Sequence, residues 1–230
     1  MIKTFIFFDI ETTGLIQGNE FPKITEFSFV AVTRDNISLV QNEVPRVLQT
    51  LTVPINPNRL IPHKVETLTD LNNKCLQNVS LFDHNIYNLI TSFLDTLMKP
   101  ICFVAHNGKA FDYPILMSEL KCIDKYLAED ILCVDTLHLF KDYFTKGNHN
   151  QEADVLILDE HGKNININQK PCNFKLITIY EHLLKEPVTN SHDAQSDCIN
   201  MLKCASCIKE YFVEWCDSNA EPLLKMKKNT

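Results

Sequence analysis

Two carboxylates inside an apolar strand constrain this chain more than any other feature of its sequence. Residues 5–15 read Phe-Ile-Phe-Phe-Asp-Ile-Glu-Thr-Thr-Gly-Leu, which places Asp9 and Glu11 two positions apart. In an extended strand, residues i and i+2 point to the same face and lie about 7 Å apart along the backbone. Most such pairs are solvated acids of an edge strand, but the bulky apolar neighbours indicate a central strand. Acids there are costly unless they are paired or bind a cation, so we expect a divalent metal site.

The composition fits one globular domain and disfavours a protein that binds nucleic acid through charge alone. Of the 230 residues, 45% are apolar, which is sufficient for a full core. The formal charge is 22 − 29 = −7, the wrong sign for a broad basic surface. Four clustered carboxylates would contribute −4 and two bound divalent ions +4, which would leave about −3 on the loaded protein.

The sequence shows no signal-like segment and no run of about 18 apolar residues. We therefore expect a soluble protein of the cytoplasm, the nucleus or both, without membrane association. Nine cysteines are scattered through mostly apolar segments, which indicates reduced thiols. The spacing Cys204-x-x-Cys207 is that of half a zinc site, but no second pair follows at the usual separation, so we expect no structural zinc.

The order of the expected elements predicts an α/β fold. Apolar and β-branched runs predict five strands, at residues 5–12, 24–32, 47–53, 101–105 and 131–134. Helical apolar periods predict helices at residues 80–97, 112–120, 136–144 and 175–184, and a last one from Asn190 or Ser191 to Trp215. Short connections indicate an antiparallel meander first, and intervening helices indicate parallel strands later. We therefore expect a mixed five-stranded sheet with helices on both faces.

This domain is expected to span residues 1–216. Within it, the polar segment 146–174 is expected to be an insertion or mobile loop, with a short hairpin formed by 155–158 and 165–167. Residues 217–230 are expected to form a short polar tail.

Three later residues are candidate partners of the strand acids. Asp112 stands at the start of a predicted helix, and His192 and Asp197 stand near the start of the last one. Taken singly, they read as a helix cap, a loop histidine and a solvated acid. Together with Asp9 and Glu11, they form a carboxylate set that selects Mg²⁺ or Mn²⁺ over zinc. Two such ions about 4 Å apart can stabilise both the attacking and the departing oxygen of a phosphodiester.

Three ordered motifs give a family resemblance that covers about residues 4–215. They are Phe8-Asp9-Ile10-Glu11-Thr12-Thr13-Gly14, Ala105-His106-Asn107-Gly108-x-x-Phe111-Asp112 and His192-Asp193-Ala194-x-x-Asp197. The set resembles the exonuclease motifs of the DEDDh 3′→5′ exonucleases. Within that superfamily the chain is most similar to the three-prime repair exonuclease (TREX) group, which degrades DNA from 3′ ends. The resemblance implies a ribonuclease-H-like fold.

The resemblance also implies roles for matching residues. Asp9, Glu11 and Asp197 would hold one Mg²⁺ ion, and Asp9 and Asp112 a second, with Mn²⁺ able to substitute. His192 would take a proton from the attacking water, and a nucleoside 5′-monophosphate would be released. The residues implied to contact the substrate are Glu11, Thr12, Leu15, Val65, His106, Phe111 and Asp197, with Leu15 as a wedge.

The expected partners are DNA 3′ ends, single-stranded or from frayed duplex, and a second copy of the chain, since members of the group are homodimers. The implied setting is DNA degradation or DNA repair.

The sequence departs from the family pattern in three ways. Position 110 is Ala where mammalian members carry a basic residue, with Lys109 as the candidate replacement; a proline-rich loop is missing; and segment 146–174 is long, which suggests that it modulates strand engagement. An RNA-directed exonuclease and a catalytically silent nucleic-acid-binding adaptor stay open as alternatives.

Overall fold

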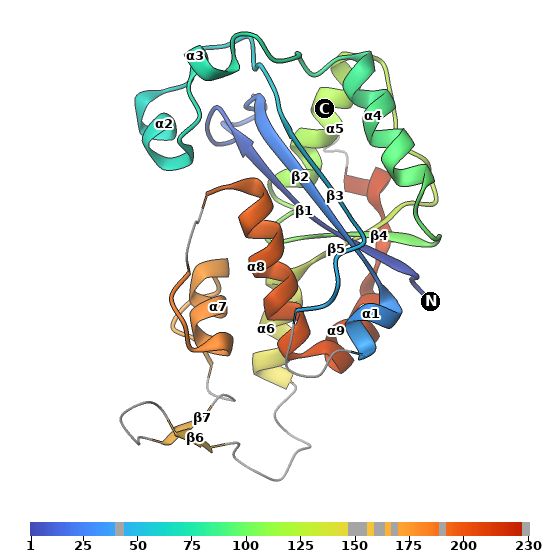
Figure 1. Cartoon of the computed structure of the whole chain (residues 1–230), viewed down its shortest axis with the longest axis vertical. Helices are drawn as coiled ribbons and strands as arrows, with labels where there is room; N and C mark the ends of the chain where they lie inside the picture. Colours follow the sequence, from blue (N-terminus) through green and yellow to red (C-terminus); the bar gives the residue numbers. More distant parts are fainter. Residues whose placement is uncertain (40–43, 147–155, 159–163, 167–169, 189–191, 227–230) are drawn as a thin grey trace.

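A mixed six-stranded sheet runs through the molecule and carries helices on both faces (Figure 1). It is seen in a computed structural model that describes residues 1–39, 44–146, 156–158, 164–166, 170–188 and 192–226. The strands follow the order β3-β2-β1-β4-β5-β8. Their bounds are β1 Thr4–Thr12, β2 Ile24–Thr33, β3 Gln49–Pro54, β4 Ile101–Ala105, β5 Leu132–Asp135 and β8 Glu221–Pro222.

The predicted change from antiparallel to parallel pairing is confirmed, and it occurs at β1. This strand pairs antiparallel with β2 on one side and parallel with β4 on the other. β3 extends the antiparallel half, and β5 extends the parallel half. β8 adds a sixth strand of two residues, which pairs antiparallel with β5. These two residues were expected to lie in a polar tail, yet Leu223, which follows them, is fully buried in the core.

Alternation along β1 sends its side chains to two separate cores. The even-numbered residues from Ile6 to Ile10 pack on the face of helices α4 (His84–Asp95) and α5 (Asp112–Cys122). Phe5 and Phe7 pack on the opposite face. The helices that contribute to this second core are α1 Arg34–Leu39, α6 Thr136–Lys146, α7 Leu176–Leu184, α8 Ala194–Cys207 and α9 Lys209–Asn219. Asp9 and Glu11 continue the odd-numbered series, so they face the side of the sheet that α8 covers.

The prediction of a single C-terminal helix is wrong. The structure divides it into α8 and α9 at Ile208, whose φ of −127° and ψ of 37° are not helical. Both helices bury apolar side chains in the same core. The apolar period therefore runs through the break without marking it.

Two short helices were not expected because they lack an apolar period. α2 (His63–Thr69) has no buried residue. α3 (Asn73–Leu76) is one turn long, and the Asn72 side chain caps it by accepting hydrogen bonds from two backbone amides. The six-residue α1 was also missed. α4 begins at His84 rather than near residue 80, because Asp83 caps its first turn.

The predicted hairpin in the polar segment is confirmed, since β6 (Leu156–Leu158) pairs antiparallel with β7 (Asn164–Asn166). The rest of residues 147–169 and the last four residues lie outside the described part of the chain. All nine cysteines carry free thiols, and five of them are buried. Among the described helices, none is long and apolar enough to cross a membrane.

Candidate active site

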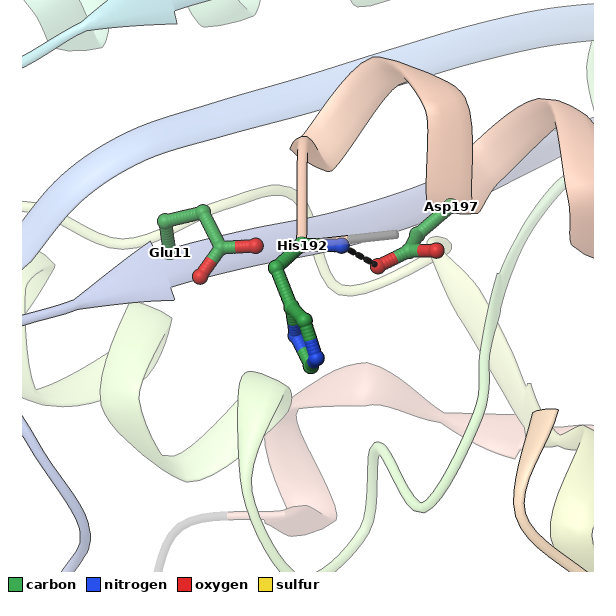
Figure 2. A group of neighbouring side chains, drawn as sticks. All are labelled: Glu11, His192 and Asp197. Carbon is green, nitrogen blue, oxygen red and sulfur yellow. Dashed lines mark hydrogen bonds between the residues drawn. The ribbon is translucent and has the colours of Figure 1, made fainter. Parts of the chain in front are cut away.

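Glu11, His192 and Asp197 come together where the end of β1 meets the start of α8 (Figure 2). One possible ligand atom of each, a carboxylate oxygen or an imidazole nitrogen, lies within 4.8 Å of the others. Across the residues that the structure describes, no other group of three or more acids, histidines or cysteines meets this distance. Three residues that the sequence singled out are thus brought into one small volume.

The first turn of α8 fixes His192 and Asp197 relative to each other. Asp193 is the N-cap, and its Oδ1 accepts a hydrogen bond from a backbone amide of the first turn at 2.7 Å. The cap is therefore this residue; the positions expected to cap the helix, Asn190 and Ser191, lie outside the described residues. His192 has a φ of 66°, and its amide donates to Asp197 Oδ2 at 3.1 Å (Figure 2). The backbone of the predicted base thus supports the predicted metal ligand.

Asp112, at the start of α5, contacts the same strand, β1. It is the first residue of α5 and is only 3% exposed. Its carboxylate accepts a hydrogen bond from the backbone amide of Ile10, the residue between Asp9 and Glu11. The start of α5 is thereby attached directly to the acidic strand.

Asp135, the last residue of β5, holds the turn that leads to Asp112. Its buried carboxylate accepts hydrogen bonds from the amides of Asn107 at 2.8 Å, Lys109 at 3.1 Å and Leu137 at 2.9 Å. The bond from Leu137 caps α6. The other two bonds reach the turn between β4 and α5, a link that the local sequence does not reveal.

Burial raises the pKa of all four predicted metal ligands, and neighbouring carboxylates add to it. Burial, followed by repulsion from Asp197, raises the pKa of Glu11 to about 8. Burial raises the pKa of Asp112 to about 7, even though hydrogen bonds from backbone amides act in the opposite direction. The pKa of Asp9 lies well above its ordinary value, through burial and then through Asp112, Asp197 and Glu11. Burial also raises the pKa of Asp197.

This donor set fits a divalent cation. The donors are carboxylate oxygens, which Mg²⁺ prefers, and a cation would remove the repulsion that raises their pKa values. Asp9 and Asp112 lie outside the 4.8 Å group. The negative charge of Asp197 nevertheless raises the pKa of both, and the charge of Asp112 also raises the pKa of Asp9. The acids therefore form one electrostatic unit rather than separate surface charges.

Four of the residues implied to contact the terminal nucleotide lie in three places: the turn after β1, the position before α5, and α2. Thr12 is buried, and its hydroxyl donates to the carbonyl of Gly14 at 2.6 Å, which shapes the turn after β1. Leu15, at the end of that turn, is 75% exposed. Phe111 precedes α5 and is partly buried, as is Val65 on α2. An exposed leucine beside buried acids suits the predicted wedge.

Both ring nitrogens of His106, a residue implied to contact the substrate, are engaged inside the protein. Nδ1 lies 2.9 Å from Thr136 Oγ1, and Nε2 lies 2.8 Å from the carbonyl of Phe174. A carbonyl only accepts hydrogen bonds, so Nε2 carries a proton. Burial lowers the pKa of His106. The imidazole therefore ties the end of β4 to the segment before α7 and has no nitrogen left for a phosphate.

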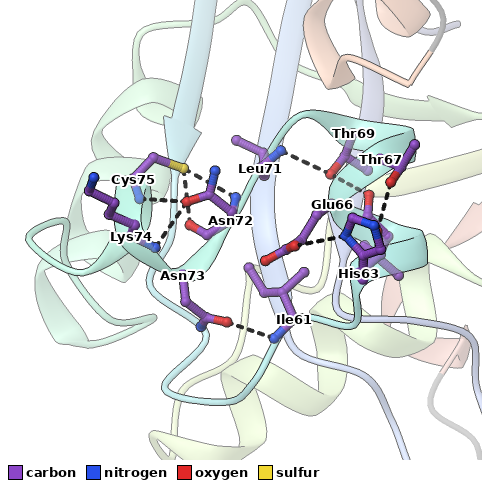
Figure 3. A network of polar contacts seen from close by, with 11 residues as sticks. Ile61, His63, Glu66, Thr67, Thr69, Leu71, Asn72, Asn73, Lys74 and Cys75 are labelled. Carbon is purple, nitrogen blue, oxygen red and sulfur yellow. Dashed lines mark hydrogen bonds and ion pairs between the residues drawn. The ribbon is translucent and has the colours of Figure 1, made fainter.

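Helix α2, which carries Val65, is held by hydrogen bonds rather than by a core (Figure 3). The Ile61 amide donates to Asn73 Oδ1 at 2.9 Å, and the Leu71 amide donates to Thr69 Oγ1 at 3.2 Å. The Asn73 side chain of α3 thus holds the segment before α2, and the Thr69 side chain closes the turn after it. Its position depends on short-range polar contacts.

Lys109, the candidate replacement for the missing basic residue, lies in the turn before α5. Its ammonium forms an ion pair with Glu221 of β8. Ala110 beside it is exposed and brings no charge. The carboxylate of Glu221 on β8 therefore pairs with the ammonium of Lys109, the candidate for a phosphate contact.

Glu26 is an acid of this site that the sequence analysis did not single out. It lies on β2 directly opposite Glu11. Its Oε2 accepts a hydrogen bond from the amide of Ala194, the first residue of α8, at 3.3 Å. Burial, and then repulsion from Asp193, raise the pKa of Glu26. The only sequence signal was its place in a strand expected to pair with the acidic one.

A family model described as Exonuclease matches residues 6–205 of the chain. That span contains the four predicted metal ligands and His192. The chain is 29% identical to three-prime repair exonuclease 1 of Bos taurus over 238 residues, which cover 98% of this chain and 70% of that protein. It is 27% identical to three prime repair exonuclease 2 of Mus musculus over 226 residues, which cover 95% of this chain and 89% of that protein.

Solved structures share the fold at low sequence identity. Cell-death related nuclease 4 superposes with a TM-score of 0.63 at 14% identity, over 96% of this chain and 66% of that one. Exonuclease I of E. coli in complex with a dT13 oligonucleotide gives a TM-score of 0.62 at 16% identity, over 94% of this chain and 43% of that one. The chain therefore spans less than half of exonuclease I. The similarity establishes the ribonuclease-H-like fold.

Proposed function

Because the chain belongs to the RNase T exonuclease family, we propose that it removes nucleoside 5′-monophosphates from the 3′ ends of DNA. The observation that carries this proposal is the meeting of Glu11, His192 and Asp197 within 4.8 Å, with further acids in electrostatic contact. The relatives named three-prime repair exonucleases support the direction of attack and the choice of DNA.

The acids would hold two Mg²⁺ ions, and Mn²⁺ would substitute. Asp9, Glu11 and Asp197 would hold one ion, and Asp9 and Asp112 the second. Bound ions of this kind supply positive charge that stabilises the attacking and departing oxygens of a phosphodiester. The raised pKa values support this assignment, because carboxylates that repel one another bind a cation with a gain in stability.

His192 would act as the general base that accepts a proton from the attacking water at an imidazole nitrogen. Its backbone amide is bonded to Asp197, so the ring can turn about its side-chain bonds while the backbone stays in place. The base and the metal ligand thus move as one unit with the first turn of α8.

The substrate end would lie against the turn after β1. Thr12 and Phe111 would border the terminal nucleotide, with Val65 on α2 nearby, and the exposed Leu15 would separate it from the next base. Single-stranded DNA or a frayed duplex end fits such a site, because the terminal nucleotide must leave its stack to enter it.

We also propose that the chain is a homodimer that degrades DNA in the cytoplasm or nucleus, in DNA repair or turnover. Among the described strands, β3 is one outer edge of the sheet, which leaves backbone groups available to a second copy. Light scattering coupled to size-exclusion chromatography measures the mass directly, and a monomer at micromolar concentration would refute the dimer.

An end-labelling experiment tests the activity. The purified protein is incubated with 5′-labelled single-stranded DNA, RNA of the same sequence and a nicked duplex, with Mg²⁺ or with EDTA. We expect stepwise shortening of DNA that requires Mg²⁺ and is lost in the Asp197→Ala variant.

Two outcomes would refute the proposal in distinct ways. Shortening of RNA but not DNA would make the protein an RNA-directed exonuclease of the same superfamily. Binding of DNA without shortening, in Mg²⁺ and in Mn²⁺ alike, would make it a silent adaptor. Shortening by Asp197→Ala would leave the activity but refute the site.

A further inference from the structure

Glu26 connects the acidic strand pair to the helix that carries His192 and Asp197. In the antiparallel register of β1 and β2 it stands opposite Glu11. Residues directly opposite each other point to the same face of a sheet, so both carboxylates face the start of α8. Glu11 is part of the cluster of possible metal ligands, whereas Glu26 accepts a hydrogen bond from the amide of Ala194 at 3.3 Å.

The start of α8 depends on contacts of this kind. The first amides of a helix have no partner within the helix. Asp193 satisfies one of them locally, at the Ser196 amide, and Glu26 satisfies another from a different element. The residue before the cap, His192, has a positive φ, which most side chains adopt only with strain. A segment with such a backbone needs support from outside the helix to keep one conformation.

A second chain of hydrogen bonds holds the same turn from β3. Ser28 and Thr52 share a hydroxyl–hydroxyl contact of 2.9 Å, and the Thr52 hydroxyl donates to Gln195 Oε1 at 2.9 Å. Ser28 stands opposite Asp9, as Glu26 stands opposite Glu11. Both strand acids therefore have a partner on β2 that contacts, directly or through Thr52, the beginning of α8.

We propose that Glu26 is a positioning residue for the exonuclease reaction, which holds the first turn of α8 and hence His192 and Asp197 against the acidic end of β1. The inference rests on the proposed function of that site. It assigns Glu26 the role of a hydrogen-bond acceptor of fixed reach rather than that of a metal ligand.

Three substitutions separate these roles. Glu26→Gln keeps an acceptor oxygen at the same reach without the charge, Glu26→Asp keeps the charge but shortens the reach, and Glu26→Ala removes both. Glu210→Ala, which removes an exposed acid in the first turn of α9, is the matched control for loss of a carboxylate near a helix start. Each variant is measured in two ways. The first is kcat and KM on single-stranded DNA with Mg²⁺, and the second is amide hydrogen exchange of residues 192–198 in EDTA.

We expect Glu26→Ala and Glu26→Asp to lower kcat by about 10- to 100-fold with KM changed less than about threefold, because a lost hydrogen bond misplaces the base. Amide exchange in the first turn of α8 should rise by about tenfold in both variants, with no change in β1. Glu26→Gln and Glu210→Ala should stay within about threefold of wild type in both measurements.

Other results would overturn the inference. If Glu26→Gln is as impaired as Glu26→Ala, the charge matters and not the hydrogen bond. If Glu26→Asp matches wild type, or if exchange at α8 does not change in any variant, Glu26 does not hold the turn. A wild-type protein without nuclease activity would refute the proposed function, and the exchange comparison would still decide whether Glu26 fixes the helix.

Discussion

Asp9 is a buried acid with four neighbouring carboxylates. Asp112, Asp197, Glu11 and Glu26 all act on it, and burial adds to their effect. It is expected to contact both metal ions, whereas Glu11 contacts one. In the metal-free protein its negative charge opposes the fold, whereas in the proposed loaded site it would contribute negative charge to both ions. Function and metal-free stability therefore make opposite demands on this side chain.

The first prediction concerns Asp9→Asn. The amide has the same shape but no charge, so exonuclease activity should fall by about 10³-fold or more. The melting temperature in EDTA should stay the same or rise, because repulsion within the cluster is relieved. Differential scanning calorimetry and the DNA assay measure the two effects. A fall in melting temperature of more than about 5 °C would show that this carboxylate stabilises the fold.

His192 gives the second prediction, and its backbone decides which substitution is informative. Asparagine tolerates a positive φ, so His192→Asn should keep the backbone hydrogen bond to Asp197 while removing the imidazole. We expect kcat to fall by about 10²- to 10⁴-fold. Mn²⁺ affinity, measured by calorimetry, should be nearly unchanged. A large loss of metal affinity would instead make His192 a ligand, which its place in the 4.8 Å group with Glu11 and Asp197 allows.

At the scale of elements, the candidate site is built where one strand ends and two helices begin. The strand acids come from one end of β1, and the other two acids come from the first turns of α5 and α8. Asp135 makes this arrangement rigid, because one carboxylate both caps α6 and holds the turn before α5. The position of Asp112 thus depends on a residue that is not one of the predicted metal ligands.

The third prediction tests that dependence. Asp135→Ala leaves buried amides without a partner and removes a helix cap, so the free energy of unfolding should fall by about 3 kcal/mol. For a chain of this size the melting temperature would fall by about 6–12 °C. Asp130→Ala, which removes the exposed partner of Lys99, is the control and should change stability by less than about 0.5 kcal/mol. Equal effects of both changes would contradict the role of Asp135.

Sequence predicts the elements that have an apolar period or a strong alternation, and it misses those held by polar contacts. β1, β2, β4 and β5 bury long apolar runs, and all were predicted. α2 has no buried residue, and β8 is only two residues long, so neither leaves a periodic trace. The break at Ile208 is hidden because apolar side chains continue on both sides of it.

The same division holds within the site. The four predicted metal ligands and His192 were predicted because they stand in ordered motifs of recognisable spacing. Glu26 was not, because its role comes from register with Glu11 and from an amide 168 positions away. His106 was assigned to the substrate, and only the fold reveals that Thr136 and Phe174 occupy its ring nitrogens. Local sequence patterns do not reveal contacts between segments that are distant in the chain, and both of these cases depend on such contacts.

For the whole molecule, the formal charge of −7 and the carboxylate cluster make stability depend on pH and on metal. The pKa of Glu11 is about 8 in the folded chain against an ordinary 4.5, and the pKa of Asp112 is about 7 against 3.8. Between the ordinary pKa of each group and its raised pKa in the folded chain, the folded chain binds more protons than the unfolded chain does. The free energy of unfolding therefore falls as the pH rises through this interval.

The fourth prediction follows with its sign. The favourable contribution of these two groups is complete below about pH 4 and is lost by about pH 8, so in EDTA the melting temperature should fall from pH 5 to pH 8. Mg²⁺ binds the ionised carboxylates, so it should raise the melting temperature more at pH 8 than at pH 5.

Mg²⁺ binding at pH 7 should also release protons, which calorimetry in PIPES and in Tris detects as different apparent enthalpies. The double variant Glu11→Gln/Asp112→Asn, which removes both groups, should lose most of the pH dependence and the proton release together. A melting temperature in EDTA that rises from pH 5 to pH 8 would mean that the folded chain favours the ionised acids even without metal. In that case hydrogen bonds such as those from Ile10 to Asp112 and from His192 to Asp197 would outweigh burial.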